Sequence, residues 1–196
     1  MKRVGVFYAT KEGHAHKVAE RVAAALAERT LDVAVHDVSD VDASAVLTQS
    51  DAAVIVGSVH LGKHEPQLIA FVKAHRLQLD AIPATFLSVC GEQAGAEQGS
   101  TPEARAKSAA NVSAQLQTFI DATGWHPRHV RPIAGAFAFT HYNALVRWVM
   151  KRIAKREGLP TDTSRDYDFT NWTALDEFSR SLAEELKGSS ERASPH

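Results

Sequence analysis

Short runs of consecutive apolar residues recur along the chain, separated by stretches with helical spacing. The first run, RVGVFY at residues 3–8, is almost continuously apolar, which is typical of a strand that is buried on both faces. Other segments with strand character follow it at 31–38, 52–57, 84–89 and 130–136. The pattern therefore predicts a sheet whose central strands are covered on both sides.

Between these strands, apolar residues recur three and four positions apart, as they do on one face of a helix. Val18, Val22 and Leu26 show this spacing in the segment after the first strand. The segments with helical spacing are 14–29, 67–75, 102–123, 142–157 and 173–187. Alternation of strands and helices predicts an α/β fold with a parallel five-stranded sheet. Ligands of such sheets bind beyond the carboxyl ends of the strands.

Composition and charge narrow the class of protein. The 196 residues suit one domain, which we expect to span 1–187 and to be followed by a flexible tail at 188–196. A net charge of −1 gives no general attraction for nucleic acid. Cys90 is the only cysteine, so neither an intramolecular disulfide nor a paired-cysteine metal site can form, and we expect no metal. No signal peptide or spanning segment is evident, so we expect a cytoplasmic protein.

The first candidate site is the polar turn between the strand at 3–8 and the helix at 14–29. Backbone N–H groups at a helix start form a phosphate site, and Gly13 permits a tight turn there. The candidate residues are Thr10, Lys11, Glu12, Gly13, His14 and Ala15. The turn matches neither a Walker loop nor a dinucleotide fingerprint. An ordinary strand-to-helix turn is the alternative interpretation.

Two further polar loops follow the strands at 52–57 and 84–89, and a flat ring could lie against their backbone. Their candidate binding residues are Ser58, Val59, His60, Leu61 and Gly62 in the second loop, and Val89, Cys90, Gly91, Glu92 and Gly95 in the third. His60, His64 and His141 are candidate bases because imidazole titrates near neutral pH, and we take His60 and His64 as the catalytic candidates. Solvated surface histidines are the alternative. We expect Cys90 to be a buried small hydrophobe.

Three polar loops at one edge of a parallel sheet resemble flavodoxin-like domains. The resemblance implies strand order 2-1-3-4-5, with FMN as cofactor, its phosphate in the first loop and its isoalloxazine between the other two. Later motifs resemble the menaquinone-dependent protoporphyrinogen oxidase family over the chain up to about Lys187. These motifs are Ile133-Ala134-Gly135-Ala136, a basic helix, Thr161-Asp162-Thr163 and Tyr167-Asp-Phe-Thr-Asn-Trp172, in that order.

This family resemblance implies an FMN-dependent enzyme of heme biosynthesis that oxidises protoporphyrinogen IX to protoporphyrin IX with a quinone as acceptor. Ala9 and Ala15 depart from the hydroxyl-rich phosphate loops of flavodoxins, so the backbone would carry more of the phosphate. The second and third loops also lack the flavin-stacking aromatics of ordinary flavodoxins. A flavodoxin-type electron carrier, an NAD(P)H quinone reductase and an FMN-free interaction domain remain alternatives. The sequence determines neither the electron acceptor nor the oligomeric state.

Residues 142–157 predict an amphipathic helix within an insert-like segment, 142–172. Its expected apolar stripe consists of Tyr142, Leu145, Val146, Val149, Met150 and Ile153. The candidate substrate or membrane residues are Arg147, Trp148, Lys151, Arg152 and Lys155. Cations opposite an apolar stripe are typical of a helix that lies on a membrane, here its inner face, and cations also pair with substrate carboxylates. An ordinary helix with solvated charges is the alternative.

Overall fold

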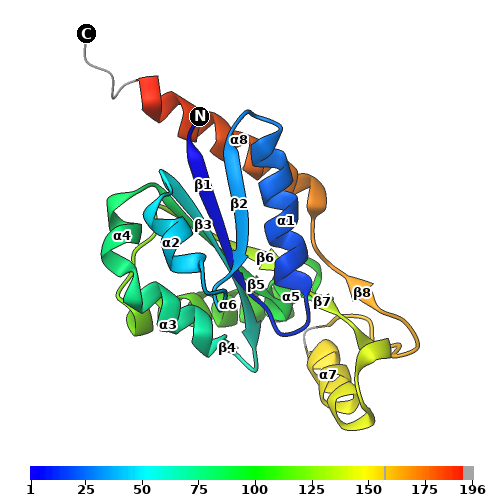
Figure 1. The fold of residues 1–196 in the computed structure, drawn as a ribbon. Coiled ribbons are helices and arrows are strands. Elements are labelled where there is room, and N and C mark those ends of the chain that lie inside the picture. Colours follow the sequence, from blue (N-terminus) through cyan, green and yellow to red (C-terminus); the bar gives the residue numbers. More distant parts are fainter. Residues whose placement is uncertain (157, 192–196) are drawn as a thin grey trace.

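A parallel sheet forms the centre of the protein in the computed structural model, which describes residues 1–156 and 158–191 (Figure 1). The strand order is β2-β1-β3-β5-β6, and all four pairings along this path are parallel. The strands are β2 (Asp32–Asp37), β1 (Arg3–Ala9), β3 (Ala52–His60), β5 (Ala84–Cys90) and β6 (His129–Ala134). This confirms the predicted order, because the additional strand β4 (Lys63–His64) lies off the path and pairs antiparallel with β3.

Side chains of the central strands alternate between two cores, one on each face of the sheet. Val4 and Val6 of β1 pack toward helices α1 (His14–Ala27) and α8 (Trp172–Glu191). Phe7 and Ala9 pack into the opposite core. That core is covered by α2 (Ala43–Thr48), α3 (Pro66–Ala74), α4 (Arg76–Ala81) and α6 (Pro102–Thr123), and Figure 1 shows α1 and α2 on opposite sides of β1.

The longest helix has local signals at both ends. The Thr101 hydroxyl oxygen accepts a hydrogen bond from the Ala104 N–H at 3.2 Å, and Pro102 occupies the first turn, where its missing N–H is not needed. Gly124 ends the helix in a left-handed conformation with φ of 65°. These signals explain why the sequence predicted α6 with its observed bounds.

A third, smaller core lies beyond the carboxyl end of β6, and we call residues 136–169 the C-terminal lobe. Its strands β7 (Ala136–Phe137) and β8 (Tyr167–Asp168) pair antiparallel, and α7 (Ala144–Arg156) projects away from the main sheet (Figure 1). A short 3-10 helix, η1 (Phe139–His141), lies between β7 and α7 in the chain. The aromatic rings of Phe137, Phe139, Tyr142 and Phe169 fill this core.

Several local elements differ from those predicted. The second loop is a hairpin, because β3 continues to His60 and a turn with positive φ at Leu61 and Gly62 leads into β4. The third loop is the end of β5 followed directly by helix α5 (Gly91–Gln98). The helix predicted to end at 187 continues to Glu191. The remainder of the expected tail, 192–196, and Glu157 lie outside the described residues.

Phe86 anchors the core between the sheet and α6, so we expect its truncation to be strongly destabilising. Its ring is fully buried and stacks on Phe119 at 4.3 Å between ring centroids. Phe86→Ala should lower the free energy of unfolding by about 3–5 kcal/mol, measured by urea denaturation. Leu77→Ala, at a side chain that is 75% exposed, should change it by less than about 0.5 kcal/mol. A loss below about 1 kcal/mol in Phe86→Ala would contradict this packing.

Candidate functional site

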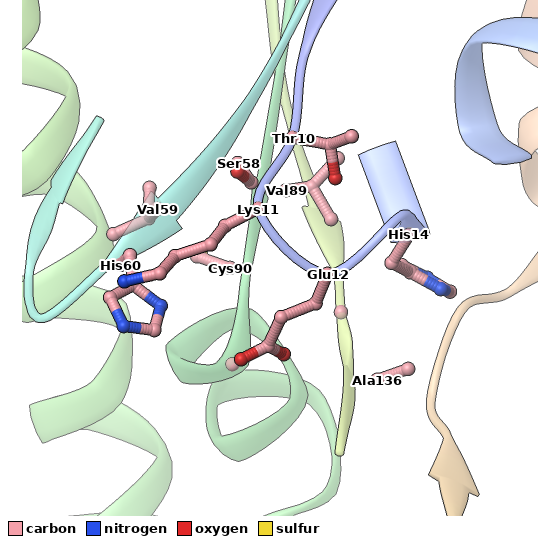
Figure 2. A pocket seen from close by; sticks show the side chains of 12 residues that line it. Thr10, Lys11, Glu12, His14, Ser58, Val59, His60, Val89, Cys90 and Ala136 are labelled. Carbon is pink, nitrogen blue, oxygen red and sulfur yellow. The ribbon is translucent and has the colours of Figure 1, made fainter. Parts of the chain in front are cut away.

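The carboxyl ends of β1, β3 and β5 meet at one edge of the sheet and form a cleft of about 60 Å³ (Figure 2). Most of the residues expected to bind a cofactor line this cleft. They are Thr10, Lys11, Glu12, His14, Ser58, Val59, His60, Val89, Cys90 and Gly91. The fold therefore brings the three predicted loops together, as expected for an open parallel sheet.

The first loop turns sharply into α1 and leaves the start of that helix open to a ligand. Gly13 has a φ of 84°, and its N–H donates to the Thr10 hydroxyl oxygen at 2.9 Å. Among the described residues, α1 has no acidic residue in its first turn and no side-chain cap. The first N–H groups of a helix have no acceptor within it, so this end favours an anion such as a phosphate.

Glu12 in this loop is tied to the C-terminal lobe. Its carboxylate accepts a hydrogen bond from the Tyr142 hydroxyl at 2.7 Å. Burial raises the pKa of Tyr142, and the hydrogen bond to Glu12 raises it further, so the phenol remains a donor at neutral pH. In Figure 2 the Lys11 side chain extends toward His60, while Glu12 points in another direction.

His14 faces the C-terminal lobe rather than the cleft. Its Nε2 lies 2.7 Å from the Thr170 hydroxyl oxygen, and that hydroxyl donates to the Ala134 carbonyl oxygen at 2.7 Å. Because the Thr170 proton is used, His14 must donate from Nε2. Burial lowers the pKa of His14, which favours the neutral ring. The imidazole points away from the cleft in Figure 2, so His14 offers a ligand its backbone rather than its ring.

Ser58, on the last part of β3, carries an unused hydrogen-bonding group. Its hydroxyl oxygen is buried and has no hydrogen-bond partner among the described residues. Buried polar atoms are almost always paired, so an orphan in a cleft indicates a group that a ligand or water completes. The neighbouring strand shows the contrast, because the Ser88 hydroxyl is paired with His64 Nε2 at 2.9 Å.

The β5 and β6 ends close the floor of the cleft with small residues. Cys90 is 2% exposed, and burial raises its pKa to about 12, so it is a thiol and not a nucleophile at neutral pH. The Gly135 N–H donates to the Cys90 carbonyl oxygen at 3.0 Å. A Cβ on Gly135 would lie 3.4 Å from the Cys90 carbonyl carbon, which is ordinary van der Waals contact with the end of β5.

The remaining predicted residues lie outside the cleft lining. Gly13 shapes the turn just before α1, Ala15 is buried against the core, Leu61 and Gly62 form the exposed tip of the hairpin, and Glu92 and Gly95 lie in α5. Their role stays a prediction. Gly135 and Ala136 line the cleft but were missed as site residues, although they belong to the Ile133-Ala134-Gly135-Ala136 motif.

His64, a candidate catalytic residue, lies beneath the surface. It is 4% exposed, and its ring centroid lies 5.3 Å from that of Phe86 and 4.7 Å from that of Phe119. Burial lowers the pKa of His64 to about 4, so the ring is neutral at pH 7. His64 contributes to a second groove beside the cleft, and His60 lines both.

The basic residues of α7 fall into two groups, because Arg147 makes hydrogen bonds within the lobe and the others are exposed to solvent. Arg147 donates to the carbonyl oxygens of Phe139 and Tyr142 at 3.0 and 2.9 Å, so it holds η1 in place. Val146, Met150 and Ala154 pack into the lobe core, but Leu145, expected in the apolar stripe, is 71% exposed. Lys151, Arg152 and Lys155 are exposed, and the Arg152 guanidinium lies 5.1 Å from the centroid of the exposed Trp148 ring. Among the described residues, no helix is long and apolar enough to cross a bilayer.

The sheet order, the cleft at its carboxyl edge and the open start of α1 define a class of protein. The chain belongs to the flavodoxin domain family, whose model matches residues 5–164. A short-chain flavodoxin associated with a bacterial microcompartment has the same fold, with a TM-score of 0.55, 15% identity, and coverage of 95% of this chain and 99% of that one. A flavodoxin from Streptococcus pneumonia gives a TM-score of 0.51, 15% identity, and coverage of 95% and 99%.

Curated relatives confirm the narrower resemblance found in the sequence. A Leishmania major protein named "Protoporphyrinogen IX dehydrogenase [quinone]" is 27% identical, with coverage of 91% of this chain and 73% of the relative. The Escherichia coli K12 protein of the same name is 26% identical, with coverage of 91% and 93%. Both alignments cover 91% of this chain, so the similarity is not confined to the loops that line the cleft.

The buried ring of His64 should make stability fall as the solution becomes acidic. Its pKa drops from the ordinary value of 6.5 to about 4 on folding, so between these values the unfolded chain binds a proton that the folded chain does not. The free energy of unfolding should therefore decrease as pH falls from about 6.5 to 4, by on the order of 3 kcal/mol from this group.

Denaturant unfolding of His64→Gln at pH 7 and about pH 4.5 tests this effect, because glutamine keeps a polar group near Ser88 without titrating. The variant should lose less stability on acidification than the wild type. His126→Gln, at an exposed histidine, should behave like the wild type. Equal acid sensitivity in His64→Gln and wild type would contradict the assignment.

Proposed function

We propose that this protein is an FMN-dependent dehydrogenase that oxidises protoporphyrinogen IX to protoporphyrin IX and passes the electrons to a quinone. The observation that carries the cofactor assignment is the cleft itself. It is lined both by the start of α1 and by the Ser58 hydroxyl, which has no hydrogen-bond partner in the part of the chain that the structure describes. The names of the curated relatives support the substrate and the acceptor.

The residues of the cleft suit FMN in two respects. The N–H groups of residues 14–16 can hold the phosphate with the help of the Thr10 side chain, although that hydroxyl already accepts from Gly13. Ser58 can donate to a polar edge of the flavin ring, and the lining residues Gly91 and Gly135 place no side chain of their own in the cleft. When bound, FMN supplies the acceptance and release of electron pairs, which no side chain of this cleft can perform.

The overall reaction balances as three two-electron oxidations. Protoporphyrinogen IX gives up six electrons and six protons to become protoporphyrin IX, and three quinones take them up as three quinols. The protein's part is to orient the macrocycle, exclude competing oxidation and accept protons.

The two candidate histidines differ in their fitness for proton transfer. His64 is buried, bonded to Ser88, and has a pKa of about 4, so it is a poor proton acceptor at neutral pH. His60 is half-buried and lines both the cleft and the neighbouring groove. We therefore assign proton acceptance to His60 and a packing role to His64.

Ser58→Ala tests the cofactor site directly. Loss of a hydrogen bond in the cleft should weaken FMN binding about tenfold, measured by flavin fluorescence titration of the apoprotein. Ser113→Ala removes a hydroxyl from the exposed side of α6 and should leave the FMN Kd unchanged. A protein that binds no FMN would overturn the proposal and favour an interaction domain.

Turnover distinguishes the activities that share this cofactor. The loaded protein should oxidise protoporphyrinogen IX under anaerobic conditions with a soluble menaquinone analogue, followed by porphyrin fluorescence. NADPH in place of porphyrinogen should give no quinone reduction. Rapid NADPH turnover would instead indicate a quinone reductase, and absence of both activities with bound FMN would indicate an electron carrier.

We also propose that α7 contacts a membrane surface, where quinones are dissolved. Lys151→Glu with Lys155→Glu reverses two exposed charges and should weaken sedimentation with anionic phosphatidylglycerol vesicles about tenfold. Arg147 is left intact because it holds η1. Lys107→Glu with Arg180→Glu makes the same charge change elsewhere and should retain binding. Equal vesicle binding by both double variants would exclude α7 as the contact.

A further inference from the structure

A second groove, larger than the cofactor cleft, lies between α3, the β3–β4 hairpin and α6. Its volume is about 850 Å³, within the range of small-molecule sites. Ile69 and Ala70 of α3 and Phe119 of α6 provide apolar lining. His60 lines both cavities, so a ligand in this groove lies beside the cleft and not at a remote surface.

Two oxygen atoms of residues that line this groove are buried without a hydrogen-bond partner among the described residues. They are Gln115 Oε1, from a side chain in a residue that is only 8% exposed, and Glu65 Oε1 at the start of α3. An unpaired buried acceptor is destabilising, and it is common where a ligand supplies the missing donor. Both atoms accept hydrogen bonds, so their partner must carry N–H or O–H groups.

The groove also carries positive charge. Lys63 of the hairpin and Lys73 of α3 both line it, and neither forms an ion pair with another described residue. Unpaired ammonium groups beside an apolar wall suit a ligand with carboxylates at its rim. The groove therefore combines an apolar wall, two acceptors and two cations.

We propose that this groove binds the reduced tetrapyrrole substrate, with its pyrrole N–H groups toward Gln115 and Glu65 and its carboxylates toward Lys63 and Lys73. The inference rests on the proposed function and assigns the substrate to a groove separate from the cofactor cleft. The macrocycle packs on Ile69 and its edge reaches the cofactor cleft past His60. An oxidised quinone matches less well, because it offers only acceptor oxygens to the two unpaired acceptors.

Porphyrin binding to the FMN-loaded protein tests the groove without turnover. The probe is protoporphyrin IX, titrated in detergent below its aggregation limit and followed by its Soret band. Lys73→Glu, an exposed charge reversal, should weaken binding about tenfold. Ile69→Trp should weaken it further by filling the groove, and Gln115→Leu should weaken it about fivefold by replacing an acceptor with an apolar group of similar size. Lys107→Glu, on a part of α6 outside the groove lining, should bind like the wild type.

Two controls keep the result decisive. FMN content and the unfolding midpoint should be unchanged in Lys73→Glu, which alters no buried group. In turnover assays the same variant should raise the porphyrinogen KM while leaving kcat within about twofold, since it acts on binding alone.

The outcomes separate the two proposals. If Lys73→Glu and Ile69→Trp bind protoporphyrin IX as the wild type does while the wild type oxidises porphyrinogen, the groove assignment is overturned and the proposed function stands. If the FMN-loaded wild type neither binds protoporphyrin IX nor oxidises porphyrinogen, both proposals fall.

Discussion

Burial of the parallel strands on both faces is the constraint from which the rest of this structure follows. β1, β3 and β5 each pair with strands on both sides, and their side chains alternate between two apolar cores. Such strands have little room for ligand-binding polar groups along their length, so these groups gather where the strands end. Ser58 and Ser88 show the result, because both stand near the ends of neighbouring strands, but only Ser88 is paired among the described residues.

The first loop also depends on contacts with Thr170 and with Tyr142 of the C-terminal lobe. The Thr170 hydroxyl joins His14, at the start of α1, to the Ala134 carbonyl at the end of β6. The Tyr142 hydroxyl holds Glu12 from the same side. The shape of the loop that would hold a phosphate therefore depends on residues far away in the sequence. This gives a physical reason for the Thr170-Asn171-Trp172 motif, which packs against the start of α1.

The periodicity of the chain was sufficient to predict the five parallel strands and the longer helices, because burial on two faces is a local pattern. It was also sufficient to predict that most of the cleft residues lie close together, since the parallel strands end at one edge of the sheet. The short elements α2, α4, α5 and β4 were not predicted, because they span too few residues to show a period.

The roles of individual side chains were harder to predict than the elements that carry them. His60 and His64 occur in one motif, yet one lines the cleft and the other packs beside Phe86 and Phe119. Arg147 has the same sequence pattern as its basic neighbours in α7, but its guanidinium donates hydrogen bonds to two backbone carbonyl groups. These differences depend on contacts made after the chain has folded, so no local pattern carries them.

The pairing of β7 with β8 has a consequence for how this chain can vary. Residues 136–137 and 167–168 lie side by side, so the chain enters and leaves the C-terminal lobe at nearly the same place. The length of the segment between them can change without shifting the register of the main sheet. Recombination or engineering could therefore exchange α7, and with it the surface chemistry of the lobe, without breaking the main sheet. The cleft would keep its geometry only if Ala136, which lines it, and Tyr142, which holds Glu12, were retained.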